Sequence, residues 1–292
     1  MTAHTKPPLH AMAAARSLAR LQHRASPPWL HAEVARRMAE RLDFILREPR
    51  QVVVWSGVVG DGTQALAQRY PRARCLSVEA DGVAPAPPPR WWQRQGLLGL
   101  PQPQPVAARS AELLWSNLLM HLVADPDALL ARWRQALAVD GFVMWSTFGP
   151  QTLRQLRALY RDHAWGSPGA ALTDMHDWGD AMVRAGFADP VMDQETLTLT
   201  WPDAESLLVE LRELGANFDT ARMAGLRTPR WRQRLLEALR NGAGPGGRVA
   251  MEFEIVYGHA FNPAPRAAVA AHTEVALDDM RQLLRRPRDS TR

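Results

Sequence analysis

Residues 112–147 read ELLWSNLLMHLVADPDALLARWRQALAVDGFVMWST, and this segment decides the fold. Short apolar runs over 112–117 and 142–147 have the length of buried strands. Between them, apolar residues recur every three or four positions over 129–137, which is the period of an amphipathic helix, and an Asp-Gly pair at 140–141 closes that helix. A strand, a helix and a strand in this order predict two parallel strands joined by a crossover helix.

The same alternation extends towards the N-terminus. Apolar residues recur at helical spacing over 30–45, and Pro49 ends the predicted helix. A β-branched run over 52–55, a glycine-containing turn, a helix-like stretch over 63–69 and a second strand over 74–78 then give a β-loop-α-β unit. Strands that alternate with helices predict an α/β fold, in which helices cover both faces of a doubly wound, mostly parallel sheet.

Three regions depart from this pattern. Residues 1–28 are rich in Ala, Pro and His, and we expect a flexible, loosely held N-terminal arm. Residues 81–105 contain seven prolines and two tryptophans, which excludes a regular helix. Residues 263–292 begin with prolines and end in arginines, which predicts a basic, disordered C-terminal tail. The remaining residues, 29–262, are predicted to fold as one domain.

The second half of this domain contains more helices than a minimal sheet needs. Residues 175–187 are a helix candidate, and 197–201 and 253–257 have the pattern of strands. We expect the additional helical segments, at about 149–173 and 203–247, to form a lid over a ligand pocket.

Composition fits a globular protein and excludes several other classes. The chain has 292 residues, of which 46% are hydrophobic and 22% charged, and this is enough for a sizeable core. No apolar run approaches the roughly 18 to 20 residues of a membrane-spanning helix, and the first residues lack the apolar segment of a secretory signal, so we expect a cytoplasmic protein. The single cysteine, Cys75, excludes an internal disulfide and a multi-cysteine zinc site, and we expect it to be a small apolar strand residue.

The formal net charge of +5 suits an acidic partner, such as nucleic acid, an anionic membrane or an acidic carrier protein. However, five arginines lie within the last dozen residues, so much of the excess belongs to the predicted tail. We therefore interpret the charge mainly as a solvated tail, and we expect neither a nucleic-acid nor a membrane partner.

Candidate ligand-binding residues lie where the predicted strands end. Ligands of an open parallel sheet bind at the carboxyl ends of its strands, and these ends carry Gly57, Gly60, Gly62, Glu79 and Asn117. Backbone amides of a glycine loop approach a cofactor closely, and a carboxylate about 20 residues later accepts hydrogen bonds from ribose hydroxyls. The glycines are irregularly spaced, however, and a glycine turn after a strand is often only a tight connection, so both interpretations stay open.

Four passages resemble the malonyl-carrier-protein O-methyltransferase family. The first, over 113–157, is LLWSNLLMHLVADPDALLARWRQALAVDGFVMWSTFGPQTLRQLR, and it resembles the region of the fourth and fifth strands. The others are DMHDWGDAMVRAGFADPVMDQETLTLTW over 174–201, LLVELRELGAN over 207–217 and FEIVYGHAF over 253–261. The resemblance covers most of residues 30–262.

This resemblance implies a class-I methyltransferase domain, which is Rossmann-like, with a seven-stranded sheet whose last strand is antiparallel. It implies S-adenosylmethionine as the methyl donor and the free carboxyl of a malonyl thioester on acyl carrier protein as the acceptor, in biotin synthesis. Glu79 matches the family's ribose-binding acidic position, and Asn117 matches the polar end of the fourth strand near the donor. Gly57, Gly60 and Gly62 would belong to the cofactor loop.

The match is incomplete after the first strand. The family carries an Asp followed by Gly-x-Gly-x-Gly there, whereas residues 55–62 of this chain read WSGVVGDG. Two other functions therefore stay open: a pseudoenzyme that binds the carrier protein or another biotin enzyme, and a methyltransferase for a different small carboxylate. A nucleic-acid methyltransferase is not expected, because residues 117–120 read NLLM where such enzymes have a motif such as Pro-Pro-Tyr.

Carboxyl methylation needs no catalytic dyad, since an ionised carboxylate is already a nucleophile and positioning in a dry pocket supplies most of the acceleration. We assign no catalytic residue. The nine histidines show no metal-ligand spacing, so we expect no metal site, and His121 and His176 are expected to be structural, the latter at a helix start.

Arginines are the candidates for binding acidic groups. Arg154, Arg157 and Arg161 follow the fifth strand and either pair with the substrate carboxylate or form a solvated helix face. Arginines between 227 and 240, including Arg230 and Arg232, are expected to form the basic surface that an acidic carrier protein contacts. The oligomeric state is not indicated.

Overall fold

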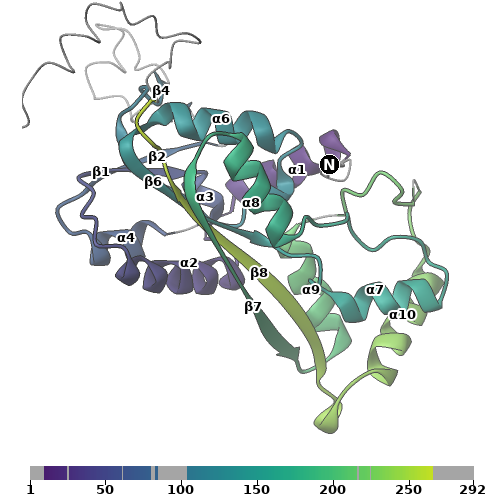
Figure 1. Ribbon diagram of the computed structural model, residues 1–292. Coiled ribbons are helices and arrows are strands. Elements are labelled where there is room, and N and C mark those ends of the chain that lie inside the picture. Colours follow the sequence, from purple (N-terminus) through teal and green to yellow (C-terminus); the bar gives the residue numbers. More distant parts are fainter. Residues whose placement is uncertain are drawn as a thin grey trace, which may run out of the picture.

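The computed structural model describes residues 10–24, 26–60, 62–79, 83–84, 104–215, 217–223 and 225–265. These residues form a six-stranded sheet with helices on both faces (Figure 1). The strands of the sheet are β1 (Gln51–Trp55), β2 (Arg74–Val78), β5 (Ala111–Ser116), β6 (Leu137–Phe148), β7 (Ala188–Trp201) and β8 (Val249–Phe261). The helices are α1 (Ala11–Gln22), α2 (Trp29–Arg41), α3 (Gly57–Gly60), α4 (Thr63–Arg69), α6 (Pro126–Ala136), α7 (Arg154–Asp162), α8 (Met175–Arg184), α9 (Ala204–Leu214) and α10 (Pro229–Asn241).

Short elements complete the described part of the chain. They are the 3-10 turns η1 (Leu42–Phe44), η2 (Met120–Leu122) and η3 (Pro245–Gly247), and the antiparallel pair β3 (Val83–Ala84) and β4 (Gln104–Pro105). Within the described residues, no helix combines the length and the apolar character needed to cross a membrane.

The sheet has the order β2-β1-β5-β6-β8-β7. β2, β1, β5 and β6 run parallel, and β8 is antiparallel to both of its neighbours. The doubly wound, mostly parallel α/β sheet with an antiparallel last strand is thus confirmed. Helix α6 is the crossover between β5 and β6 that residues 112–147 predict; Asp125 caps it by accepting a hydrogen bond from the Ala128 N–H.

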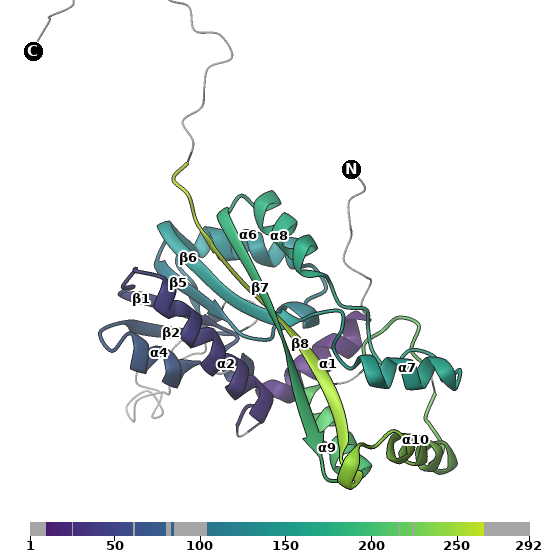
Figure 2. The same ribbon diagram turned by 60° about the horizontal axis from the view of Figure 1, so that its bottom comes forward.

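Alternating side chains of the strands fill two cores. On β1, Val52 and Val54 face the core under α2 and α4, whereas Val53 and Trp55 face the core under α6 and α8. Figure 2 shows α2 on one side of the sheet and α6 and α8 on the other. Because β5 is buried on both faces, Leu113, Leu114 and Trp115 form a continuous apolar run rather than an alternating pattern.

The two longest strands, β7 and β8, extend beyond the rest of the sheet as a two-stranded ribbon. β6 pairs with β8 only as far as Phe148 and Ile255, whereas β7 and β8 stay paired as far as Trp201 and Val249. Helices α7, α9 and α10 lie around this extension (Figure 2). The ribbon thus carries the helices that were predicted to form a lid.

Two predictions differ from the structure. The described sheet has six strands rather than seven: β1 lies between β2 and β5, and most of the proline-rich residues between β2 and β5 lie outside the described part of the chain. The predicted loose arm contains α1, in which Ala13, Ala14 and Leu21 are buried. Residues 1–9 of that arm and residues 266–292 of the predicted tail lie outside the described residues.

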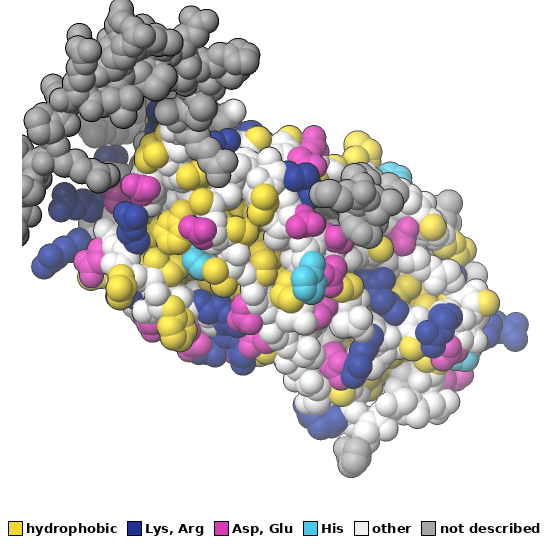
Figure 3. Space-filling model, in the orientation of Figure 1, with side chains coloured by type: hydrophobic (Ala, Val, Ile, Leu, Met, Phe, Trp, Pro, Cys, Tyr) yellow, Lys and Arg dark blue, Asp and Glu magenta, His cyan; other side chains and the backbone are white. Residues whose placement is uncertain are grey.

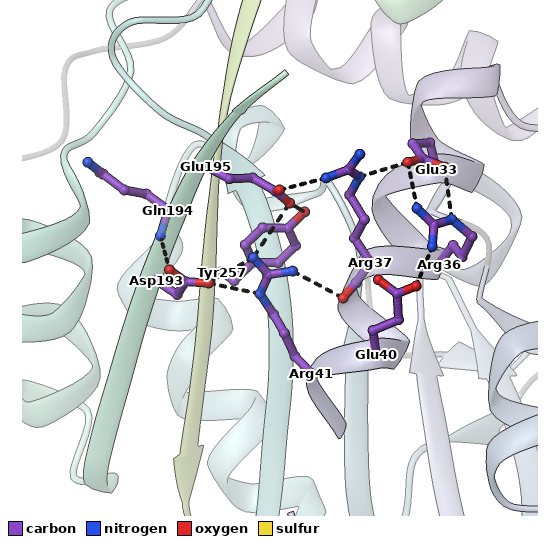
Figure 4. Close-up of polar contacts among 9 residues, drawn as sticks. All are labelled: Glu33, Arg36, Arg37, Glu40, Arg41, Asp193, Gln194, Glu195 and Tyr257. Atoms are coloured by element: carbon purple, nitrogen blue, oxygen red, sulfur yellow. Dashed lines mark hydrogen bonds and ion pairs between the residues drawn. The ribbon is translucent and has the colours of Figure 1, made fainter. Parts of the chain in front are cut away.

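Charged side chains attach α2 to the part of the β7–β8 ribbon where β8 still pairs with β6 (Figure 4). Nη1 of Arg37 lies 2.7 Å from Oε2 of Glu195 on β7, and Nη2 of Arg41 lies 2.7 Å from Oδ2 of Asp193. The Tyr257 hydroxyl of β8 donates a 2.6 Å hydrogen bond to Oε1 of Glu195, and the Arg41 guanidinium lies 3.7 Å from the centre of the Tyr257 ring. Burial, and then the bond to Glu195, raise the pKa of Tyr257, so this hydroxyl stays a hydrogen-bond donor.

Replacing Glu195 should therefore loosen the contact between α2 and the ribbon. We expect Glu195→Ala to lower the free energy of unfolding by about 1–3 kcal/mol, because two arginines and the Tyr257 hydroxyl lose a half-buried partner. Glu40→Ala is the matched control: the Glu40 side chain is 59% exposed and pairs with Arg36 on the same helix, which contributes about 0.5 kcal/mol or less. Urea denaturation followed by circular dichroism measures both, and equal losses would contradict this role of Glu195.

Candidate functional site

The amide of Asn117 joins three segments at the carboxyl end of the sheet. Its Nδ2 donates to the backbone oxygen of His31 on α2, at 2.8 Å, and to that of Gly60 on α3. Its Oδ1 accepts a 2.6 Å hydrogen bond from the Ser146 hydroxyl of β6, which in turn accepts one from the Leu118 N–H. Asn117 is at the predicted strand end, and its buried side chain connects these segments by hydrogen bonds.

The glycine loop packs tightly against β5. A Cβ atom on Gly60 would lie 2.5 Å from the backbone oxygen of Asn117, and one on Gly62 would collide with the Trp115 indole. Gly62 also has a φ of +120°, which other residues rarely adopt. Packing therefore requires glycine at both positions, whatever else the loop binds. Gly57 is the first residue of α3, directly after Ser56.

Glu79 directly follows β2, next to this loop. Val78 pairs with Trp55 of β1, so the ends of the two strands are adjacent. The Glu79 carboxylate accepts a 2.6 Å hydrogen bond from the Gln22 side-chain amide of α1. The carboxylate is thus placed to accept hydrogen bonds from N–H or O–H donors above the sheet.

Buried polar atoms near Asn117 lack partners. Among the described residues, neither ring nitrogen of His31 has a hydrogen-bond partner, nor does the Ser56 hydroxyl, although both residues are about 1% exposed. Each buried polar atom without a partner costs about 1–3 kcal/mol. A polar ligand at this end of the sheet would offset that cost.

Sequence reasoning missed His31 as a site residue. Burial, with a smaller contribution from the positive charge of Arg24, lowers the pKa of His31 from 6.5 to about 4. The one sequence feature that points to His31 is its position on the apolar face of α2, four residues before Ala35 and seven before Met38. A histidine on such a face is usually a core residue, so the spacing alone does not indicate a ligand.

Helix α1 covers the same end of the sheet. Its residues Ala14 and Leu21 form an apolar cluster with Val59 of α3, Leu122 of η2 and Phe218. Val59 is 1% exposed. The loop after β1 therefore packs an apolar side chain against α1.

A cavity of about 600 Å³ lies beside this cluster, between η2 and the helices on the ribbon. At its inner end, the His121 ring lies 4.7 Å from that of Phe148, and Nδ1 of His121 lies 3.4 Å from the Thr147 hydroxyl. Apolar side chains line most of it, including Leu156, Leu211 and Phe253. Five arginines also line it: Arg20, Arg157, Arg212, Arg227 and Arg232.

The structure separates the three candidate arginines after β6. Arg154 pairs with Glu252 at 2.6 Å, and Arg161 pairs with its neighbour Asp162 and is 76% exposed. Of the three, Arg157 alone lines the cavity.

The remaining site predictions concern histidines and metal binding. His176 lies at the start of α8, where its backbone N–H donates to the capping residue Asp174, so its predicted place at a helix start is confirmed. In the described part of the chain, no group of three or more His, Cys, Asp or Glu side chains is arranged to hold a metal ion.

Comparisons with known proteins give sequence relatives but no family-model match. A malonyl-[acyl-carrier protein] O-methyltransferase of Gallionella capsiferriformans is 38% identical over 251 residues, which are 81% of this chain and 85% of that protein. One of Laribacter hongkongensis, with the same name, is 36% identical over 253 residues, 81% of this chain and 84% of that protein. Among solved structures, YcgJ of Bacillus is similar at a TM-score of 0.48 and 11% identity, over 80% of this chain and all of that one.

The buried ring of His31 should make stability depend on pH. Because its folded pKa is about 4 and its unfolded pKa about 6.5, the unfolded chain binds the proton first, and stability falls as the pH falls from 6.5 to 4. The loss from this residue is on the order of 3 kcal/mol. Between pH 7 and pH 4.5, the free energy of unfolding should therefore fall less in His31→Leu than in the wild type. Denaturation at the two pH values measures this difference. An equal fall in both proteins would contradict the assignment.

Proposed function

Because the chain belongs to the malonyl-[acyl-carrier protein] O-methyltransferase family, we propose that it methylates the free carboxyl of a malonyl thioester carried by acyl carrier protein. The donor in this proposal is S-adenosylmethionine, and the step belongs to biotin synthesis. The observation that carries the proposal is the 38% identity over 81% of the chain.

The residues at the carboxyl end of the sheet fit this donor. Glu79 would accept the hydrogen bonds of the ribose hydroxyls, as it now accepts one from Gln22. The loop Gly57–Gly60 would lie against the methionine part, and the Ser56 hydroxyl and the His31 ring would supply polar atoms that have no partner among the described residues. When bound, the donor supplies a methyl group activated by its sulfonium.

The chain's own contribution to the reaction is binding and orientation. The substrate carboxylate is ionised at neutral pH, so no side chain needs to remove a proton from it. The apolar walls around Leu156, Leu211 and Phe253 would exclude water from the carboxylate. His121 lies at the inner end of the cavity and supports its wall through Phe148 and Thr147.

A second candidate function is a pseudoenzyme that binds the carrier protein without methylating it. Two observations favour it: Val59 packs against α1 at the strand ends, and Trp55 is packed edge-on against Trp133 where the family has a carboxylate. Gln22 already occupies one oxygen of Glu79, which leaves the other oxygen for the ribose hydroxyls. Donor binding therefore distinguishes the two functions.

We propose that α10 is the surface that contacts the carrier protein. Leu235, Leu236 and Leu239 face the core, which leaves the arginines of this helix exposed. Figure 3 shows several arginine side chains, in dark blue, at the end of the molecule that α7 and α10 form. Arg232 also lines the cavity, so an acidic carrier docked on α10 would deliver its thioester into it. A cytoplasmic location is part of the same proposal.

The central test is donor binding together with methyl transfer. We expect the wild-type protein to bind S-adenosylmethionine in calorimetry and to methylate malonyl-carrier protein. Glu79→Ala should weaken donor binding by roughly 10- to 100-fold, because it removes charge-assisted hydrogen bonds worth about 1.5–3 kcal/mol. Glu40→Ala, an exposed glutamate on α2, should bind as the wild type does. If the wild type binds no donor at millimolar concentration, the enzyme proposal fails and the pseudoenzyme takes its place.

Reversing charge on α10 tests the docking surface. We expect Arg230→Glu with Arg232→Glu to weaken association with malonyl-carrier protein by about tenfold, and the difference from the wild type should shrink as salt is added. Arg132→Glu with Arg184→Glu, on α6 and α8, makes the same change in net charge elsewhere. Surface plasmon resonance at two salt concentrations measures both pairs; equal weakening by the two pairs would indicate net charge rather than a defined surface.

A further inference from the structure

Arg157 differs from the other arginines of the cavity in its surroundings. Arg20, Arg212 and Arg232 are exposed, whereas Arg157 and Arg227 are half-buried. The Arg227 guanidinium lies over the Trp231 ring, 4.5 Å from its centre. Burial lowers the pKa of Arg157 from its usual value, although Asp219 opposes this effect. The guanidinium is therefore a partly dehydrated cation next to an apolar cavity.

Backbone carbonyl groups hold this guanidinium in place. Nε donates to the oxygen of Thr152 at 3.2 Å, Nη1 to that of Gly169 at 3.2 Å, and Nη2 to that of Ala170 at 2.8 Å. A guanidinium has five N–H groups, so two, one on each terminal nitrogen, have no partner within the described part of the chain. The side chain is held in place and can still donate hydrogen bonds to a ligand.

No carboxylate neutralises Arg157 within the described residues. The ion pairs of Arg154 with Glu252 and of Arg161 with Asp162 use the acids around α7, and Asp219 acts on Arg157 without forming an ion pair. A buried charge without a counter-ion is costly, and an anion that enters the cavity offsets the cost. Arg157 is only half-buried and Asp219 acts on it, so this cost is partial, and a carboxylate in the cavity would lower it further.

The backbone after β6 sets the position of α7. The Gly149 N–H donates to the backbone oxygen of Glu254 at 2.8 Å, and the Leu153 N–H donates to that of Glu252 at 2.7 Å. Residues 149–153 thus run along the edge of β8 beyond the end of β6. This places Arg157, one helical turn after Leu153, on the cavity side.

We propose that Arg157 binds the free carboxylate of the malonyl group and makes the cavity select malonyl over acetyl thioesters. The proposal rests on the proposed function and names the residue that recognises its substrate. Arg157 donates to the carboxylate oxygens through the two free N–H groups, as arginine does in carboxylate recognition. Methylation turns the carboxylate into a neutral ester, which accepts weaker hydrogen bonds, so the same contact favours release of the product.

The test compares the binding of malonyl-carrier protein with that of acetyl-carrier protein. Because both share the same carrier surface, the ratio of the two affinities reports only the carboxylate. We expect the wild type to prefer malonyl by roughly 10- to 100-fold, and Arg157→Gln to bring the ratio close to one. Arg157→Lys keeps the charge but not the planar fork, and should give an intermediate ratio.

Two control variants separate recognition from structure. Ser167→Ala removes the 2.7 Å hydrogen bond to the Gly169 oxygen and so loosens the same loop, yet it keeps the cation. Arg154→Gln removes a neighbouring cation from α7. Both should keep the malonyl preference, and thermal denaturation shows whether each variant is folded. Steady-state kinetics should show a raised KM for malonyl-carrier protein in Arg157→Gln.

Several outcomes would overturn the proposal. These are an unchanged preference in Arg157→Gln, an equal loss of preference in Ser167→Ala, and a wild type that binds both thioesters equally. If the wild type prefers malonyl through Arg157 but transfers no methyl group, the proposed enzyme function fails while the carboxylate site stands. If methyl transfer is normal and Arg157→Gln has no effect on KM, the carboxylate site alone fails.

Discussion

The hydrogen bonds of the Asn117 amide are the constraint on which the rest of the site depends. They hold α2, the loop after β1 and β6 to one point at the end of β5. Gly60 must approach Asn117 closely for this, which sets the path of the loop. The loop in turn directs Val59 towards α1, and α1 brings Gln22 onto Glu79. One buried amide therefore determines how the carboxyl end of the sheet is arranged.

Much of the fold was predictable because the central strands have to be apolar. β5 and β6 are buried on both faces, and α6 between them carries its apolar residues at helical spacing, so residues 112–147 have few alternatives. Helix α1 was not predictable in the same way. Its buried positions are mostly alanine and serine, which give little hydrophobic signal, and its stability comes from tertiary packing on Val59 and Phe218.

The site was predictable at the level of positions but not of contacts. Glu79 and Asn117 lie at strand ends as expected, because strand order fixes which ends are neighbours. The partner of each side chain could not be predicted in this way. Arg154, Arg157 and Arg161 look equivalent in the sequence, and only the distant Glu252 and the carbonyl groups of Gly169 and Ala170 distinguish them. Such long-range pairings leave no local pattern.

The paired extension of β7 and β8 also has a consequence for how such a protein can diverge. Beyond Phe148 and Ile255 the ribbon leaves the sheet, and α7, α9 and α10 are carried on it rather than on the strands that bear Glu79 and Asn117. Insertions or substitutions in these helices can therefore accumulate without altering the pairing of β1, β2 and β5. A lineage could thus acquire a new acceptor specificity by remodelling the ribbon and its helices as one module, while inheriting the opposite half of the domain intact.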